Sequence, residues 1–160
     1  MHFARSYSPI VVWGSLVAIL FFLPGCKSKL PQYPEDHARF ERIVKAVEDL
    51  RKAYEEKNED ALRELMLPLD GLERLQLEIQ KDFNAYADID MEFTIERMTI
   101  NGGRATVNIR WEGTWKRKPQ DVGIVGQGHG VLIWSGKQVI LLADIDGDLP
   151  FGMATRESLS

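Results

Sequence analysis

The sequence is poor in the residues that build disulfides and nucleophilic sites: it has one Cys and three His among 160 residues. A single cysteine cannot pair within its own chain, so a hydrophobic core has to hold the fold together. No Ser, Cys or second His accompanies His129 at a spacing typical of a catalytic set. We therefore expect no metal and no cofactor, and the sequence carries no catalytic signature.

Clustered positive charge is also missing. The chain has 20 Lys and Arg against 24 Asp and Glu, which gives a formal net charge of −4. Nucleic-acid binding needs clustered Lys and Arg to contact phosphates, so this balance excludes it. The net charge is also the wrong sign for general attraction to anionic lipid. No repeat is visible, and the chain is long enough for one domain with a real core.

Residues 1–25 have the layout of an export signal: a start with Arg5, an apolar run from Ile10 to Leu23, and the pair Pro24-Gly25. The segment Leu23-Pro24-Gly25-Cys26 resembles the lipobox of bacterial lipoproteins. That resemblance implies cleavage between Gly25 and Cys26, and acyl chains such as palmitate on Cys26. The alternatives are an ordinary secretory signal with an incidental cysteine, or an uncleaved anchor.

A lipid on Cys26 would bind the protein to a membrane of the cell envelope. Lys27 rather than Asp follows the lipidated position. In a Gram-negative source this resembles the default for the outer membrane, facing the periplasm. Residues 26–35, with Pro31 and Pro34, are predicted to be a tether between the lipid and the folded domain.

Helical periodicity predicts three helices after the tether. The first runs from Asp36 to about Glu56, with an apolar stripe that includes Phe40 and ends at Tyr54. Asn58 can cap a short second helix, which Pro68 ends. Asp70 can cap a third, in which we expect Leu72, Leu75, Leu77 and Ile79 to point inward and Phe83 to close the helix.

Alternation of apolar and polar residues then predicts four strands. They cover Met91 to Glu96, Ala105 to Trp115, Ile124 to Trp134 and Val139 to Ile145. Asn101-Gly102-Gly103 and Ser135-Gly136 are hairpin turns between them. The result is an α+β fold: three N-terminal helices packed on a curved four-stranded antiparallel meander.

This order of elements, with Tyr54 before Lys57-Asn58-Glu59-Asp60-Ala61-Leu62, resembles the nuclear transport factor 2-like (cystatin-like, SnoaL-like) superfamily. The resemblance covers residues 36–152, and 153–160 are expected to form a tail. It implies a cone, in which a curved sheet wraps the long helix around an open or a filled cavity. Gly126, Gly128 and Gly130 share one face of the third predicted strand. They let that strand bend, or let another backbone approach it.

Two polar residues are candidates for catalysis. In the ketosteroid-isomerase branch of this superfamily, a helix tyrosine works with buried carboxylates, and the resemblance implies that role for Tyr54 with Asp88 or Asp90. His129 is a candidate general base in a cavity. The structural alternatives are backbone bonding by the two Asp residues, and a surface position for His129.

Four aromatic residues, Phe93, Trp111, Trp115 and Trp134, line either a ligand pocket, a partner-binding face or the core. Asp144, Asp146 and Asp148 begin like a calcium loop, but Leu149 and Thr155 stand where that loop needs Gly and Glu. We read them as a solvated strand edge. Lys116-Arg117-Lys118 is a basic segment at the end of a predicted strand, and it either touches acidic groups or forms a solvated loop.

The sequence thus supports three hypotheses. The first is a lipid-anchored, non-catalytic accessory protein that binds a small apolar ligand or an envelope protein. The second is an enzyme of the isomerase or dehydratase type that uses the cone as a dry pocket. The third is a structural homodimer that packs through its sheet. An open cavity with converging polar groups would favour the enzyme, and a filled cone with an exposed aromatic face would favour a partner or dimer.

Overall fold

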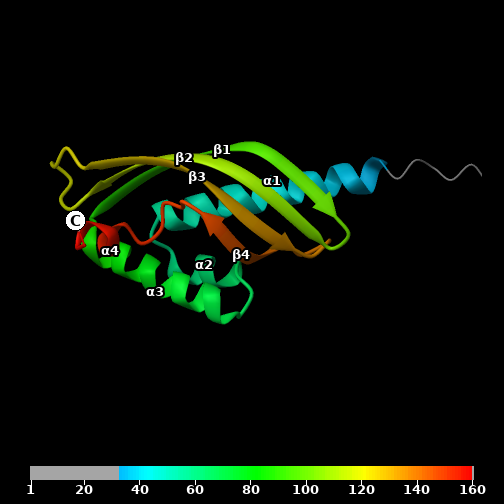
Figure 1. Ribbon diagram of the computed structural model, residues 1–160, viewed down its shortest axis with the longest axis horizontal. Helices are drawn as coiled ribbons and strands as arrows, with labels where there is room; N and C mark the ends of the chain where they lie inside the picture. The colour runs from blue at the N-terminus through cyan, green and yellow to red at the C-terminus, as the bar shows by residue number, and fades with distance from the viewer. Residues whose placement is uncertain (1–32, 160) are drawn as a thin grey trace, which may run out of the picture. The chain divides into compact units, whose positions relative to one another are not determined.

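The computed structural model describes residues 33–159, so the predicted signal peptide, Cys26 and most of the predicted tether lie outside the described residues. Helices α1 (Tyr33–Glu55), α2 (Glu59–Glu64) and α3 (Asp70–Ala85) precede the strands (Figure 1). The strands are β1 (Asp88–Asn101), β2 (Arg104–Lys116), β3 (Ile124–Ser135) and β4 (Leu141–Gly147). They form one antiparallel sheet in the order β1-β2-β3-β4, which confirms the predicted α+β meander.

None of the helices within residues 33–159 is both long enough and apolar enough to cross a bilayer. The residues predicted as a C-terminal tail contain a further short helix, α4 (Met153–Glu157).

Helix α1 presents an apolar stripe to the concave side of the sheet. The buried residues follow the helical period: Ile43, Ala46, Val47, Leu50, Ala53 and Tyr54. Phe40 was expected in this stripe but is 44% exposed. It follows Arg39, whose guanidinium reaches the carbonyls of Gly102 and Gly136 in two hairpin turns. At this level the sheet ends in its turns, so Phe40 has little of the sheet left to cover it.

The N-caps predicted for α2 and α3 can be compared with the structure. The Asn58 side chain accepts a bond from the Ala61 amide at 3.0 Å, as predicted. The predicted Asp70 cap is wrong, because Leu69 occupies the N-cap of α3 and makes no side-chain bond there. Leu77 was expected inward but is 58% exposed. It stands two residues, or about 200°, from the buried Ile79, which puts it on the opposite face of the helix.

Strand β2 alternates regularly between the two faces of the sheet. Its inward residues are buried: Ala105, Val107, Ile109, Trp111 and Trp115. A register shift between Ile95 and Arg97 interrupts the pairing of β1 with β2. Such a bulge bends the strand and increases its twist.

The glycines of β3 leave room for other groups, as the sequence predicted. A Cβ at Gly130 would lie 2.3 Å from the Leu149 side chain, and one at Gly128 would lie 2.8 Å from the ring of Trp111. A Cβ at Gly126 would lie 3.2 Å from the ring of Trp115. Large side chains and the segment after β4 thus pack directly on the bare backbone of β3.

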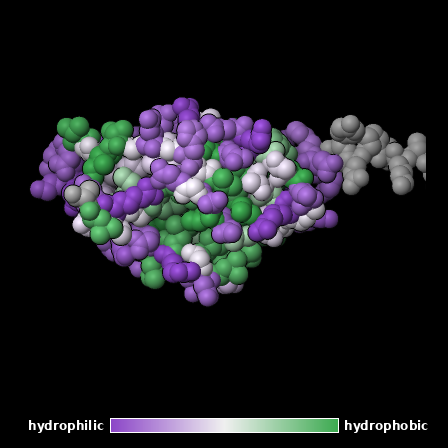
Figure 2. Space-filling model, in the orientation of Figure 1, coloured by the Kyte–Doolittle hydropathy of each residue, from purple (hydrophilic) through white to green (hydrophobic). Residues whose placement is uncertain are grey.

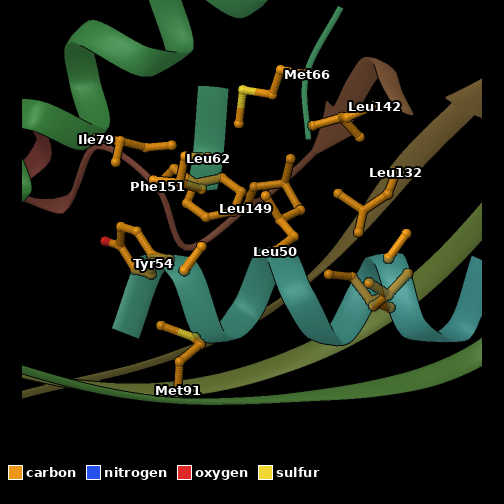
Figure 3. Packing of buried hydrophobic residues seen from close by; sticks show 14 of the residues in the cluster. Leu50, Tyr54, Leu62, Met66, Ile79, Met91, Leu132, Leu142, Leu149 and Phe151 are labelled. Carbon is orange, nitrogen blue, oxygen red and sulfur yellow. The ribbon is translucent and has the colours of Figure 1, made fainter. Parts of the chain in front are cut away.

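The segment after β4 fills the cone. Leu149 and Phe151 are each 4% exposed, and Figure 3 shows them beside Leu50, Tyr54 and Leu62 of α1 and α2. The indole Nε1 of Trp111 donates to the carbonyl of Asp148 at 2.7 Å, which holds the segment against the sheet. The interior of the cone is therefore packed with the chain's own side chains.

Candidate functional site

The candidate site is a polar cluster around Tyr54, inside the cone. The Tyr54 hydroxyl donates to Oδ2 of Asp82 at 2.8 Å and accepts from Nε1 of Trp115 at 2.9 Å. All three residues are completely buried. The Pro150 carbonyl is farther from the hydroxyl, at 3.4 Å, so the single hydroxyl proton goes to Asp82.

Asp82 holds the start of α4 in place. Its Oδ2 accepts from the Gly152 amide and its Oδ1 from the Ala154 amide, both at 2.7 Å. With the Tyr54 hydroxyl, the buried carboxylate has three donors, which offset the cost of taking a charge out of water. The carboxylate of α3 thus accepts hydrogen bonds from amides at the beginning of another helix, which have no partner within that helix. The two helices are far apart in the sequence.

Electrostatics keep Tyr54 in its neutral form. Burial raises the pKa of the Tyr54 phenol far above its ordinary value, and the negative charge of Asp82 raises that pKa further. The rings of Phe83 and Phe151 flank the phenol at centroid distances of 5.7 and 5.0 Å. Tyr54 is therefore a hydrogen-bond donor whose only proton is already used within the protein.

The carboxylate that meets Tyr54 is not one that the sequence suggested. Asp88 and Asp90 are both exposed, and Asp88 lies 3.8 Å from the Lys116 ammonium. Asp82 was missed because the pattern of α3 was read for apolar residues alone. It stands one turn from Ile79 on the same inward face, and that position on a buried stripe was the available signal.

His129 does not join this cluster. It pairs with Arg110 in the sheet register, and both point away from the inward-facing Trp111. Its side chain is 67% exposed, with Nε2 3.4 Å from a carboxylate oxygen of Glu96. Tyr54 and His129, the two catalytic candidates, thus lie on opposite faces of the sheet.

The predicted aromatic residues face inward. Trp111, Trp115 and Trp134 are buried, and Phe93 is half-buried against the same core. The rings of Trp111 and Trp115 pack edge to face at 6.0 Å. The indole nitrogen of Trp134 has no hydrogen-bond partner among the described residues. These side chains are part of the core, not an exposed face.

The opposite, outer face of the sheet is polar. Residues that share it on β1, β2 and β3 include Glu92, Thr94, Arg110, Glu112, Gln127 and His129. No aromatic side chain stands at these outward positions of the paired strands. Its apolar residues are Val125, Val131 and Ile133 of β3, which stand among these polar side chains and form no aromatic face of the kind typical of dimer interfaces.

Two hollows on the described surface lie outside the cone. One of about 310 Å³ lies between α2 and α3 and is bordered by Glu59, Arg63 and Glu73. Another, of about 500 Å³, lies between α3 and β4 beside Leu75, Leu77 and Ile145. Figure 2 shows apolar side chains gathered at the centre of the face turned toward the viewer. Neither hollow is lined by Tyr54.

The charged candidates at the ends of the strands are engaged locally. Asp144 and Asp146 each accept a bond from the next backbone amide, and Asp148 pairs with Arg156 at 2.8 Å. Within residues 33–159, no three His, Cys, Asp or Glu residues gather as a metal site would require. In the basic segment 116–118, Arg117 pairs with Glu157 at 2.6 Å.

Comparison with known proteins identifies the fold. A scan against models of protein families finds no match, and a search of curated proteins finds none either. Solved structures do match. A conserved protein from Planctomyces limnophilus is 18% identical with a TM-score of 0.55, and the match covers 70% of this chain and 99% of the other.

Two further structures carry a family name. A proposed dehydratase of the nuclear transport factor 2-like family from Streptomyces avermitilis is 14% identical, with a TM-score of 0.56, and covers 71% of this chain and 99% of its own. A nuclear transport factor 2-like superfamily protein from Salmonella enterica is 7% identical, with a TM-score of 0.59, and covers 71% and 94%. At these identities the likeness defines the fold, which is nuclear transport factor 2-like, and not the activity.

Proposed function

We propose that this chain is a lipid-anchored protein of the cell envelope whose folded domain is non-catalytic and binds an envelope protein. The observation that carries the proposal is the closed cluster of Tyr54, Asp82 and Trp115. Every polar atom that could act on a substrate there already bonds to the protein itself. A catalytic group needs to come within hydrogen-bond reach of a substrate, and a completely buried one has no such access.

Other readings of the same fold have less support. A small apolar ligand would need the space that Leu149 and Phe151 occupy. A homodimer through the sheet would have to bury the charged outer face, including Arg110 and Glu112, whose side chains pair with each other at 3.1 Å. An isomerase or dehydratase would need Tyr54 and His129 to converge, and they lie on opposite faces of the sheet. A protein partner requires none of these changes.

The envelope location rests on the lipobox-like segment ending at Cys26, which lies outside the described residues. If Cys26 is acylated, Cys26→Ser should release the protein from membranes and abolish acyl labelling, whereas Ser28→Ala should change neither. Continued membrane retention of the Cys26→Ser chain would contradict the proposed anchor.

The non-catalytic part is tested on the full chain extracted from its own membranes. Native mass spectrometry should give the mass of the acylated chain without a bound small molecule. In cells, photo-crosslinking from outward surface positions should give a discrete protein adduct that His129→Ala leaves unchanged. A stoichiometric small molecule in the purified protein, or the absence of any adduct, would count against the proposal.

A further inference from the structure

The basic residues of the described chain differ in whether their side chains have a partner. Four of them make no ion pair and no side-chain hydrogen bond with any described residue: Arg97, Arg104, Lys118 and Lys137. Arg104 and Lys137 stand in the two turns at one end of the sheet, and Arg97 precedes one of these turns on β1. Lys118 stands at the other end, in the loop between β2 and β3. Three of the four unpaired cations thus belong to one end of the domain.

This end is a rigid unit, which we call the hairpin tip: the turns 101–104 and 135–138. The Gly136 amide donates to the Gly103 carbonyl at 2.9 Å, which joins the two turns. From α1, the Arg39 guanidinium donates to the carbonyls of Gly102 and Gly136. Arg39 is only 7% exposed, and no carboxylate is among its partners in the described chain. The tip is therefore fixed to the first helix.

The hairpin tip is also the end of the domain at which the described chain begins, with Tyr33 of α1. Figure 1 shows that α1 begins beside the two turns and runs toward the loop between β2 and β3. Six residues, 27–32, separate Cys26 from Tyr33. Even fully extended, the seven residue steps from Cys26 to Tyr33 reach only about 25 Å. The 13 residues of β2 span roughly 44 Å, so the loop at its far end lies much farther from Cys26.

We propose, building on the lipid anchor of the proposed function, that the hairpin tip rests on an anionic bilayer surface. Arg104 and Lys137 contact lipid phosphates, and Ile100, 37% exposed at the end of β1, adds apolar contact. Acidic residues near the start of α1 do not cancel this charge entirely. Glu35 is paired with Arg42 at 3.0 Å, whereas Glu41 lies 3.2 Å from His37 and is offset only where that imidazole carries a proton; Asp36 has no ion pair among described residues.

The net negative charge of the chain gives no indication of this basic surface, because most basic residues are neutralised by neighbouring acids. The mean charge predicts no attraction to anionic lipid, whereas three of the four unpaired cations lie toward one end and predict attraction mainly there. Surface attraction of this kind contributes roughly a fivefold change in binding for each Lys or Arg, and screening confines it to about 8–10 Å. The anchor keeps the tip near the bilayer, and the cations then set the orientation of the domain.

The experiment uses the full acylated chain, in which the lipid occupies the only native thiol. A single added cysteine, Asn101→Cys at the tip or Gln120→Cys in the far loop, then carries an environment-sensitive fluorophore. The protein is reconstituted in phosphatidylcholine vesicles that contain quencher lipids, with or without phosphatidylglycerol. We expect quenching at position 101 that increases with phosphatidylglycerol, and none at position 120.

Charge removal supplies the matched control. Arg104→Gln combined with Lys137→Gln should abolish the effect of phosphatidylglycerol at position 101, whereas Lys118→Gln, which removes an unpaired cation at the far end, should not. Equal quenching at positions 101 and 120, or quenching independent of phosphatidylglycerol, would overturn the inference. A spectral change at position 101 without vesicles would mean a protein contact at the tip and would overturn it as well.

Mass spectrometry of the same sample separates the two proposals. An acylated chain whose tip label does not respond to lipid overturns the orientation and leaves the anchor standing. A chain without acyl groups on Cys26 overturns the anchor and, with it, the orientation.

Discussion

At the scale of single residues, the buried hydrogen bonds of Tyr54 explain more than its apolar ring does. The sequence marked Tyr54 as the end of an apolar stripe, and it correctly predicted burial. It could not predict the partner, because Asp82 and Trp115 are brought to the hydroxyl by α3 and β2, 28 and 61 residues away. Local features fared better: the Asn58 cap depends on an amide three residues away, within reach of sequence reasoning.

Tyr54→Phe should destabilise the fold by about 1–3 kcal/mol, because Trp115 Nε1 loses its acceptor and Asp82 loses one donor without access to water. Urea unfolding of the full chain measures the loss. Tyr86→Phe is the matched control: its hydroxyl bonds at 3.0 Å to Glu157, which is only partly buried. We expect a smaller loss there, and equal stability of Tyr54→Phe and wild type would contradict the account.

The same phenols predict how stability depends on alkaline pH. Burial raises the pKa of Tyr86 to about 12, and burial with the Asp82 charge raises the pKa of Tyr54 from its ordinary value of 10.0. Above about pH 10 the unfolded chain loses these protons before the folded chain does, so the free energy of unfolding falls as pH rises.

Because one phenol is removed, Tyr54→Phe should reduce this alkaline slope by about 1.4 kcal/mol per pH unit between roughly pH 10 and 12. Urea midpoints across this range test it, and a slope unchanged from wild type would argue that Tyr54 is not buried in its neutral form.

At the scale of elements, periodicity predicted the three helices and four strands, and the departures have tertiary causes. Helix α4 was missed because Asp82 of α3 supplies its cap, a contact that residues 153–160 do not contain. The length of β1 was underestimated because the register shift between Ile95 and Arg97 breaks its alternation. Leu77 was misplaced by counting it as inward without following the 100° step of the helix.

Gly130→Ala tests the packing of the C-terminal segment on β3. The new methyl group would meet Leu149 at 2.3 Å and the Asp148 carbonyl at 3.1 Å, so we expect a loss of about 1–3 kcal/mol from overpacking. In Gly71→Ala, whose Cβ would have no neighbour within 4 Å, stability should be unchanged or slightly higher. Chemical denaturation compares the two, and equal effects would contradict close packing at Gly130.

At the scale of the whole folded unit, the sequence predicted a cone but left open whether it was empty. That question depends on Leu149 and Phe151, which follow the last strand and fold back across α1 and α2. Nothing in their local pattern indicates that return, since a short apolar segment after a strand can also remain at the surface. The filled interior is the observation on which the proposed binding function, rather than a pocket enzyme, depends.

The central claim is that no ligand space remains inside the cone. Titration of the full chain with an apolar fluorescent probe tests it directly, beside Phe151→Ala and Leu77→Ala. Phe151→Ala should lose about 3–5 kcal/mol and, where circular dichroism confirms folding, gain one saturable site. We predict no saturable binding by wild type. The account is contradicted if wild type binds the probe saturably, Leu77→Ala keeps that binding and Phe151→Ala does not strengthen it. The probe would then occupy an open pocket inside the cone.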